Sequence, residues 1–580
     1  MSTTLRDFVA SELGKLPGSR GLTLHVLLSS PQRELELFPY SKIERNQKIN
    51  SQNVLLLVAE SSAQSASGAT DPASAPRIFV AALEATLYLF PGTSSSILYI
   101  GKIDTTGFSQ TTPSPARTLA RATIDYYTRS DTRPPECGQR VWVHLFARAQ
   151  SQYLFPDSSL WKAKRVLGDA GLVRWWWSLL GDVARDVASS KPVQSGFEGT
   201  KLWYILPGFA EVEAYHTLSS GSSFKMAQSS ELPWSYGHPY DDPNVTFPLT
   251  GKPLKSTLSS NGGSSKDMSI ASLIPIFPDD PKARFMGEIA STTSERDVPP
   301  PPPKPRSPVS PRSRNVSSSV DPDSLPPKSL ESPVQSPVKK RRRVDEGTHN
   351  EPLTDGPLVR EAEKNDEGSE KINGSSSATS ESLSKDTTTA SCPEPATEPA
   401  PSVSQSSLTS APTKGSTHTE SELVRRGRQA LEAVSAQEFW ERMGFRQECA
   451  LGAVTAFFVA VFENPSTTPK LSDTRQGKEC IPLPTHTRIT QTLMNHAFST
   501  TEKAIRSTQM LESTIRTLCD GASSATKQDE EEISPDTTSF YRTYIFKSIT
   551  VNNPALVPRE PVPIQPQQVN VLQVKRKVRR

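Results

Sequence analysis

Two adjacent carboxylates and a lysine stand between two phenylalanines in the run Phe277-Pro278-Asp279-Asp280-Pro281-Lys282-Ala283-Arg284-Phe285. A loop of this composition can place a carboxylate as a base beside a buried lysine. The structural alternative is a turn that satisfies its own ion pairs, because Pro-Asp-Asp-Pro is typical of turns. The run is therefore a candidate for acid–base chemistry with a purely structural alternative.

A tryptophan cluster with nearby cations is the second candidate site. Seven of the eight tryptophans fall between Trp142 and Trp234, and Trp175, Trp176 and Trp177 are consecutive. Successive helical residues are about 100° apart, so at least one of the three must face a cleft, a ligand or a partner. Cations lie just upstream, at Arg148, Lys162, Lys164 and Arg165. Such a surface suits a ligand with phosphates and an apolar arm, such as a nucleotide or coenzyme A. Core packing beside solvated charges is the alternative.

Two basic runs indicate where the protein works. Lys339–Arg343 is five cations long and is followed by Val344, in a stretch rich in proline and serine. An exposed cluster of this kind fits the acidic groove of an import receptor, and a solvated charge run is the alternative. Lys575–Arg580 is either a second import signal or a tail that contacts an acidic partner. We therefore expect a nuclear protein.

Several function classes have no support in the sequence. It contains no GxSxG elbow, no Walker-type phosphate loop and no HExxH pair, which argues against hydrolase, kinase and metalloprotease activities. Its five cysteines form no CxxC pair, so neither a zinc site nor a disulfide framework is expected. The longest uncharged apolar run, 450–462, is shorter than the ~20 residues that span a bilayer. No basic and apolar leader opens the chain, so we expect a soluble, reduced, intracellular protein.

The composition predicts a folded part diluted by a disordered one. Apolar residues are 34% of the chain and proline accounts for 51 of 580 residues. The net charge of only +3 excludes a chain-wide field that would attract nucleic acid. The elements that must position the candidate residues alternate between strand-like and helical patterns, which predicts an α/β fold around one sheet. Strands are expected at 22–28, 54–58, 77–90, 97–102 and 140–146, and helices at 5–16, 116–127 and 173–187.

Signature segments add a family resemblance. SQYLFPDSS (Ser151–Ser159) and IPIFPDDPKARF (Ile274–Phe285) resemble segments of the fungal histone acetyltransferase of the regulator-of-Ty-transposition family. Further similar segments follow in the same order: KIDTTGF (102–108), RWW (174–176), LPW (232–234), FW with FRQE (439–448), and PVP ahead of the basic tail (561–580). The resemblance leaves out the Pro/Ser-rich insert.

The resemblance implies a fold, an activity and partners. The fold would be that of the CREB-binding-protein acetyltransferase domain, a central mixed sheet flanked by helices. The activity would be transfer of the acetyl group of acetyl-CoA to lysines of newly made histone H3, with no metal. Histone chaperones of the anti-silencing and nucleosome-assembly-protein types would present the substrate, in replication-coupled nucleosome assembly and the DNA damage response.

The resemblance also implies roles for individual residues. Asp280 would be the proton acceptor, Lys282 the buried lysine that autoacetylates, and Trp176 and Tyr153 neighbours of the incoming lysine. The cofactor would contact Ile103, Asp104, Thr105, Phe146, Gln150, Arg165, Val166, Leu167 and Trp175. Burial between Trp176, Tyr153 and Asp280 would favour a neutral lysine amine, whereas the carboxylate opposes it, so Asp280 is expected to orient the amine more than to titrate.

The implied domain order interrupts the enzyme twice. The acetyltransferase domain would run over 1–287 and continue over 421–463, with a disordered insert at 288–420. Residues 464–539 would be polar and mostly disordered, and 540–580 would form a C-terminal segment with the basic tail. The rival function is a non-catalytic chromatin or chaperone scaffold with a degenerate acetyltransferase fold. Direct nucleic-acid binding rests only on the two basic runs, and it predicts a steep salt dependence of DNA affinity.

Overall fold

The described part of the chain forms one compact unit. The structure is a computed structural model that describes residues 3–41, 48–61, 76–190, 199–220, 232, 234–254, 270–296, 421–446, 449, 454–464, 478–524 and 539–555. All of these belong to the unit built from Met1–Pro301 and Thr417–Arg580. Both basic runs lie outside the described residues, as does most of the insert expected at 288–420.

A mixed sheet forms the centre of the described residues, with strand order β10-β1-β3-β4-β5-β6-β9-β7-β8 and with β11 and β2 paired to β1 and β3. The strands are β1 Gly18–Ser29, β2 Gln32–Glu34, β3 Ile49–Ser61, β4 Arg77–Phe90, β5 Ser95–Thr105, β6 Arg140–Ala147, β7 Thr200–Ile205, β8 Trp234–Tyr236, β9 Ala456–Glu463, β10 Cys480–Ile481 and β11 Phe546–Asn553. The β5–β6 and β7–β8 pairs are parallel, whereas the β3–β4–β5 ladder is antiparallel. The expected mixed α/β fold is confirmed.

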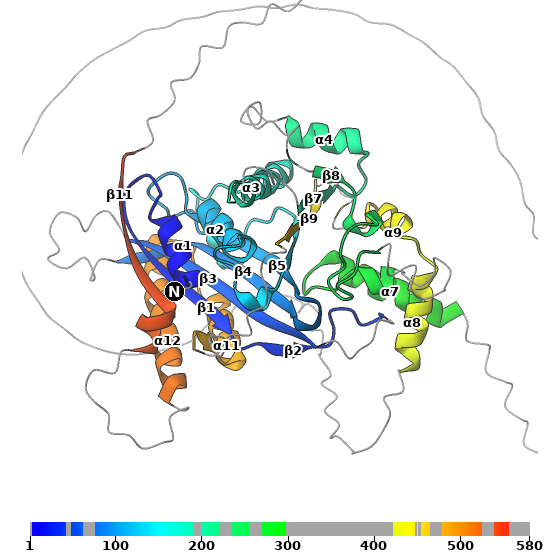
Figure 1. Ribbon diagram of the computed structural model, residues 1–580. Coiled ribbons are helices and arrows are strands. Elements are labelled where there is room, and N and C mark those ends of the chain that lie inside the picture. The colour runs from blue at the N-terminus through cyan, green and yellow to red at the C-terminus, as the bar shows by residue number, and fades with distance from the viewer. Residues whose placement is uncertain are drawn as a thin grey trace, which may run out of the picture. The chain divides into compact units, whose positions relative to one another are not determined.

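Helices flank this sheet on both faces (Figure 1). The helices are α1 Leu5–Leu13, α2 Ala116–Thr128, α3 Asp169–Ser189, α4 Glu211–Ser219, α6 Ile270–Leu273, α7 Pro281–Arg296, α8 Glu422–Glu432, α9 Ala436–Met443, α11 Leu483–Met494 and α12 Thr501–Ser524. Helices α1, α2 and α3 pack side by side, α11 and α12 pack on β1, β3 and β4, and α7 packs on α8. None of the described helices is both long and apolar enough to cross a bilayer.

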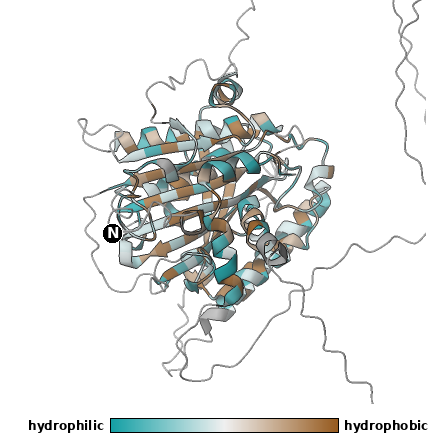
Figure 2. Cartoon of the chain, turned by 90° about the vertical axis from the view of Figure 1, so that its right-hand side faces the viewer, coloured by the Kyte–Doolittle hydropathy of each residue, from teal (hydrophilic) through white to brown (hydrophobic). Residues whose placement is uncertain are grey.

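Strand β6 divides the core because its side chains alternate between the faces of the sheet. Val141 and Val143 belong to the cluster under α2 and α3, whereas Trp142 and Phe146 pack with α6 to α9. Figure 2 shows apolar residues on the strands and polar residues on the outer helix surfaces. The sheet therefore carries a separate apolar cluster on each face in this region.

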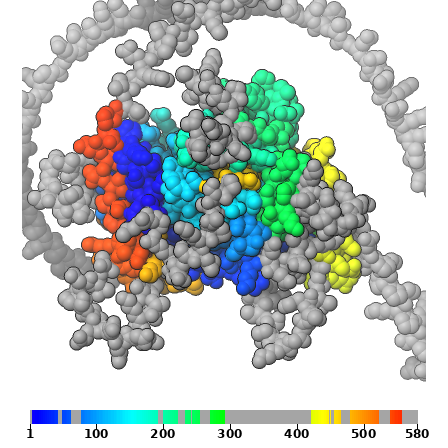
Figure 3. All heavy atoms as spheres, viewed as in Figure 1, coloured from blue at the N-terminus to red at the C-terminus, as the bar shows by residue number. Residues whose placement is uncertain are grey.

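The two ends of the described chain meet at one edge of the sheet. Strand β11 pairs antiparallel with β1, and it contacts α1 (Figure 3). A buried hydrogen bond of 2.8 Å joins His25 Nε2 of β1 to the hydroxyl of Tyr541, just before β11. The C-terminal segment is thus part of the domain, because it completes the β1 side of the sheet.

The expectation of a mostly disordered segment at 464–539 was wrong for residues 478–524. Helices α11 and α12 occupy most of this stretch and bury Ile489, Leu493, Leu511 and Ile515, and Phe498 in the connection between them is also buried. The boundary expected at 288 also falls inside α7, which continues to Arg296 and buries Ile289. The polar surface of these helices hid a narrow apolar stripe, which is sufficient for a helix that packs on one side only.

Candidate functional site

The Asp280 turn starts helix α7. Asp280 precedes Pro281, and its Oδ1 accepts a hydrogen bond of 2.9 Å from the backbone N–H of Lys282. A carboxylate at the N-cap followed by proline at the first helical position is a favoured helix start. Asp279 just before it has a left-handed φ of 59°, a conformation that aspartate tolerates better than most residues. The sequence Pro-Asp-Asp-Pro therefore directs Asp280 inward and leaves Asp279 outside.

A buried ion pair joins Asp280 to Lys282. The Lys282 ammonium contacts Asp280 Oδ2, and the two side chains are 7% and 0% exposed. Lys282 Nζ also lies 4.4 Å from the ring centre of Phe457 on β9, within the range of a cation–π interaction. A buried pair of this kind has to be kept together, because removing either partner leaves an uncompensated charge.

A small cavity of about 10 Å³ lies beside Lys282 and is lined in part by His144, Tyr240 and Trp440. Its size is that of a single water molecule. Burial, with the nearby Lys282 charge, holds the pKa of His144 well below its ordinary value, so the ring is neutral. Burial, with the charge of Asp280, raises the pKa of Tyr240, which keeps this phenol protonated. The lysine thus faces neutral polar groups and aromatic rings.

Asp104 is the centre of a second buried cluster. Its Oδ2 accepts hydrogen bonds from the backbone N–H groups of Tyr153, Leu154 and Phe155 at 2.7, 2.9 and 3.1 Å. Its Oδ1 accepts from the N–H of Thr105 at 2.8 Å and from Lys164 Nζ at 3.0 Å. Both side-chain oxygens of Asp104 are therefore occupied within the protein, and Asp104 fixes the 151–159 loop on the end of β5.

Lys164 belongs to this cluster and not to the exposed cations. Its side chain is 4% exposed, and its ammonium also donates to Ser158 Oγ at 2.8 Å. Gly107, with φ of +83°, lets the chain approach so closely that a Cβ would lie 2.6 Å from the Lys164 Cα. Phe108 stacks on Trp161 at 4.4 Å between ring centres. The KIDTTGF segment and the loop are thus locked to each other.

The three consecutive tryptophans have different surroundings on α3. Trp176 and Trp177 are buried, and Trp177 packs against Tyr204 and Trp234. Trp175 is half-buried, with the Arg117 guanidinium 5.8 Å from its ring centre and the edge of Trp176 against it at 4.7 Å. Trp175 is therefore the member of the triplet that is partly open to a ligand, as the helical geometry required.

The remaining predicted cofactor residues range from packed to exposed. Ile103 is half-buried against the core, Thr105 is half-buried, and Phe146 stacks on Phe457 at 4.5 Å. Exposed members of the set are Gln150, Arg165, Val166 and Leu167. The last three precede α3, whose N-cap Gly168 makes no side-chain capping hydrogen bond. An uncapped helix start beside an arginine is a favourable place for phosphate groups.

The structure brings together two groups of the predicted residues. Asp280 and Lys282 meet Phe146 through the shared ring of Phe457, among the α6–α9 cluster. Tyr153 and Trp176 pack with the cluster on the other face of the sheet. Within the described residues, Trp176 therefore packs on the opposite face of the sheet from the Phe457 ring that contacts Lys282.

Sequence reasoning missed three side chains of these groups. His144 follows Val143 in β6, and consecutive residues of a strand point to opposite faces of the sheet. This alternation was the signal that could have placed His144 on the Lys282 side. Phe457 and Trp440 come from the other side of the insert, and nothing in their local sequence links them to Lys282.

Tyr153 has a further partner, since its hydroxyl donates to the carbonyl of Arg148, and burial raises the pKa of Tyr153 to about 12.

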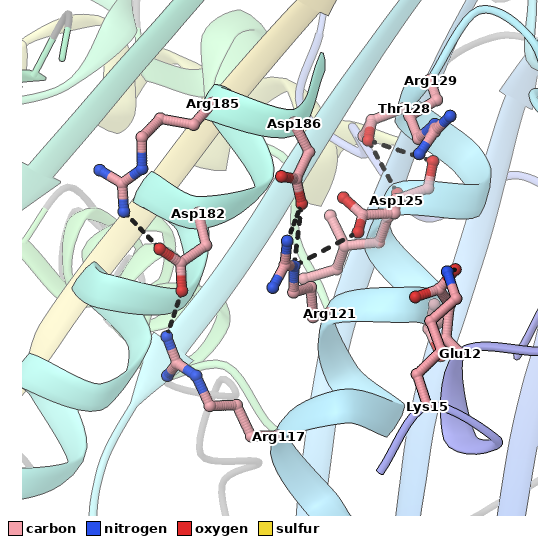
Figure 4. Close-up of polar contacts among 12 residues, drawn as sticks. Glu12, Lys15, Arg117, Arg121, Asp125, Thr128, Arg129, Asp182, Arg185 and Asp186 are labelled. Carbon is pink, nitrogen blue, oxygen red and sulfur yellow. Dashed lines mark hydrogen bonds and ion pairs between the residues drawn. The ribbon is translucent and has the colours of Figure 1, made fainter. Parts of the chain in front are cut away.

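A larger, charged pocket of about 320 Å³ lies away from these groups, where α1, α2 and α3 end. Figure 4 shows Arg121 between Asp186 and Asp125, which it contacts as an ion pair on either side. Burial, and then the charge of Asp186, raise the pKa of Asp125 from its ordinary 3.8 to about 8. Asp125 is therefore protonated near neutral pH.

This shift predicts a pH dependence of stability. Between about pH 4 and 8 the folded chain keeps the Asp125 proton that the unfolded chain releases, so the free energy of unfolding falls as pH rises, by roughly 1.4 kcal/mol per pH unit from this group. We expect Asp125→Asn to remove this contribution, so that the free energy of unfolding of the variant increases relative to that of wild type as pH rises. Urea unfolding of both proteins at about pH 5, 6 and 7 measures it; parallel curves for the two proteins would contradict the assignment.

Comparison with known proteins gives a consistent result. The family model of the histone acetyltransferase KAT11-type domain matches residues 117–300 and 418–514. The chain is 25% identical over 287 residues to the histone acetyltransferase rtt109 of Aspergillus flavus, covering 47% of this chain and 45% of that protein. It is 26% identical over 222 residues to the histone acetyltransferase rtt109 of Schizosaccharomyces pombe, covering 38% and 50%. The chain thus matches about half the length of these curated relatives.

A solved structure has the same fold. The crystal structure of Rtt109 from Aspergillus fumigatus aligns with a TM-score of 0.53 at 17% identity, covering 95% of this chain and 100% of that one. The two segments of the family match contain Asp280 and Lys282 in the first and Phe457 in the second, so both sides of the buried pair lie within matched residues. Asp104 precedes the matched segments.

Proposed function

The chain belongs to the Rtt109-type histone acetyltransferases, which carry a KAT11 domain, and from this premise we propose that it transfers the acetyl group of acetyl-CoA to lysines of newly made histone H3. The observation that carries the proposal is the buried Asp280–Lys282 pair in the first segment of the family match, which contacts Phe457 from the second segment. A buried charge pair is costly to maintain, which favours a retained site over a degenerate fold.

The residues before and within α3 fit the coenzyme. Arg165 and the uncapped start of α3 suit its phosphates, and the exposed apolar side chains of Val166 and Leu167 with half-buried Trp175 suit its arm. When bound, acetyl-CoA supplies an acetyl thioester whose carbonyl carbon a lysine amine can attack. The protein's part is to hold that arm beside the amine.

Asp280 has a defined role toward Lys282. Both of its oxygens are engaged by this one residue, through the backbone N–H and the ammonium. Acetylation of Lys282 requires a neutral amine, and Asp280 Oδ2 is already in contact with the proton that must leave. We assign Asp280 as the proton acceptor for Lys282 autoacetylation, and as the group that orients Lys282 during transfer to a histone lysine. Tyr153 stays protonated and positions the loop.

The cellular setting follows from this activity as part of the proposal. The protein would act on chromatin in the nucleus, directed there by Lys339–Arg343. Histone chaperones of the anti-silencing and nucleosome-assembly-protein types would present H3–H4, and the mark would serve replication-coupled nucleosome assembly and the response to DNA damage. Incubation of the full chain with acetyl-CoA and H3–H4, with and without each chaperone, followed by mass-spectrometric mapping of acetylated lysines, tests substrate and partner together. Acetylation confined to non-histone proteins would overturn it.

The coenzyme assignment predicts the effect of Trp175→Ala. Loss of the half-buried indole should raise the KM for acetyl-CoA about tenfold, or about 1.4 kcal/mol, with little change in kcat, because the ring contacts the arm and not the reacting atoms. Steady-state kinetics with varied acetyl-CoA measure both constants. Phe445→Ala, which removes an aromatic ring that is 85% exposed, is the matched control and should change neither. An unchanged KM for Trp175→Ala would remove this residue from the coenzyme site.

A further inference from the structure

Two arginine–aspartate pairs join helix α2 to helix α3, as Figure 4 shows. Arg117 contacts Asp182 at 2.6 Å, and Arg121 donates through Nε to Asp186 at 2.9 Å. Each pair joins residues 65 positions apart, so the second repeats the first about one helical turn later. The two helices therefore run parallel, and the pairs fix the position of α3 along α2.

The pair nearer the start of α3 also reaches Trp175. Arg117 Nη2 donates to Ser178 Oγ at 3.1 Å, and Arg117 Nη1 donates to the carbonyl of Trp175 at 3.4 Å. The same guanidinium lies over the Trp175 ring, 5.8 Å from its centre. Residues three and seven positions after Trp175 share its face of the helix, and these are Ser178 and Asp182. One guanidinium therefore contacts three residues of this face.

The Arg117 guanidinium is itself held in place. Asp182 accepts from Arg117 through Oδ2 and contacts Arg185 through Oδ1, so the carboxylate is fixed from two sides. Arg117 Nη2 uses both of its N–H groups, on Asp182 and on Ser178. A guanidinium is a planar, rigid fork, so these contacts also set its orientation. They favour a role inside the protein over the capture of a ligand's phosphate.

The Trp175 ring has a second fixed neighbour. The ring of Trp176 lies 4.7 Å away and nearly perpendicular to it, at 84°. Trp176 is buried in the core, so its own position is set by packing. Between this ring and the guanidinium, the partly exposed Trp175 indole is held in one orientation before any ligand arrives. Such preorganisation lowers the entropy cost of binding.

We propose that Arg117 is a positioning residue for the coenzyme, which holds the Trp175 indole in the orientation that contacts the apolar arm of acetyl-CoA. The inference rests on the proposed function, because it takes Trp175 as part of the coenzyme site. Arg117 acts through Trp175 and does not touch the reacting atoms.

Steady-state kinetics with varied acetyl-CoA and saturating H3–H4 test this coupling. Arg117→Met should raise the KM for acetyl-CoA about three- to fivefold with little change in kcat. In the Trp175→Ala background it should add nothing, because the ring that it holds is absent. Arg121→Met removes a pair of the same kind between the same helices, away from Trp175, and should change KM in neither background. Additive effects of Arg117→Met and Trp175→Ala would overturn the proposal, as would an equal rise in KM for Arg121→Met.

A second acetyl donor separates positioning from direct phosphate contact. S-acetylpantetheine carries the acetyl thioester and the apolar arm but no phosphate. Arg117→Met should lower kcat/KM for this donor and for acetyl-CoA by the same factor. A loss confined to acetyl-CoA would overturn the proposal, because it would place the guanidinium on the phosphates.

Fluorine NMR of the full chain labelled with 5-fluorotryptophan reads the ring without turnover. Trp175→Phe identifies the Trp175 resonance. We expect this resonance to shift when coenzyme A is added to wild type, and to move or broaden in ligand-free Arg117→Met but not in Arg121→Met. An unchanged Trp175 resonance in Arg117→Met would overturn the proposal.

These outcomes separate the inference from the proposed function. A Trp175 resonance that responds to coenzyme A and depends on Arg117 supports the inference even if wild type transfers no acetyl group to histone. Acetyl transfer by wild type with a Trp175 resonance that ignores coenzyme A overturns the inference and leaves the acetyltransferase proposal standing.

Discussion

Replacement of Asp280 by asparagine is expected to abolish acetyl transfer and to destabilise the fold by about 3–5 kcal/mol. The side chain is fully buried and holds the Lys282 ammonium, which asparagine cannot neutralise. The lysine would then have to remain charged beside the Phe457 ring or lose its proton. Either outcome changes the group around which the site is built. Urea unfolding measures the free energy of unfolding. The initial rate of H3 acetylation, measured without denaturant at a temperature at which the variant is folded, gives the activity.

The adjacent carboxylate is a matched control for this substitution. Asp279 is 74% exposed by its side chain and pairs with half-buried Lys102 at 3.3 Å. An exposed pair of this kind contributes about 0–1 kcal/mol, and asparagine tolerates the left-handed φ of 59° at this position. Asp279→Asn should therefore leave rate and stability nearly unchanged. Near-full H3 turnover of Asp280→Asn would show that Asp280 does not orient Lys282 for transfer, and undiminished Lys282 autoacetylation with an unchanged pH profile would show that it is not the proton acceptor.

The second large effect is expected at Asp104. Asp104→Asn replaces a carboxylate that accepts five hydrogen bonds by an amide with one acceptor oxygen. The buried Lys164 ammonium, which donates to Asp104 and to Ser158, loses the negative charge of the first of these partners. We expect a loss of about 3–5 kcal/mol in the free energy of unfolding. Acetyl transfer should fall with it, because the Tyr153–Phe155 backbone loses its anchor on β5.

A double-mutant cycle tests the reason for this loss. Lys164→Met removes the ammonium, so the double variant Asp104→Asn with Lys164→Met should be more stable than Asp104→Asn alone. Glu84→Gln is the control substitution. Glu84 pairs with Lys102 at 3.2 Å, its side chain is 29% exposed, and the pair should contribute no more than about 1 kcal/mol. Additive effects of the two buried substitutions would contradict a coupled pair.

The sheet and its flanking helices were predictable because their signals are local. The alternation over Arg140–Phe146 and the apolar runs of β3 and β4 indicate strands, and in the structure most residues of these strands are buried on both faces of the sheet. The triplet Trp175–Trp177 likewise required one partly open ring, which proved to be Trp175. Periodicity failed at α11 and α12, where threonine and charged residues dominate and the buried side chains form a thin stripe.

The site itself depended on contacts that no local pattern contains. Lys164 reads as one of several exposed cations, and only its position 60 residues beyond Asp104 in a folded loop makes it an internal partner. Phe457 lies across the insert from Lys282, so its cation–π contact could not be inferred from spacing. Asp280 and Lys282 were identified by resemblance, whereas their direct pairing is a property of the turn that the proline residues impose.

The most direct test of the proposed activity is transfer of label from acetyl-CoA to an H3–H4–chaperone complex by the full chain, beside Asp280→Ala and Trp176→Ala. We predict strong labelling of H3 by wild type that collapses in both variants, with coenzyme binding retained in Asp280→Ala. Absence of labelling by wild type, together with absence of coenzyme binding, would contradict the enzyme and favour a chromatin scaffold in which the residues of 148–177 form a partner surface.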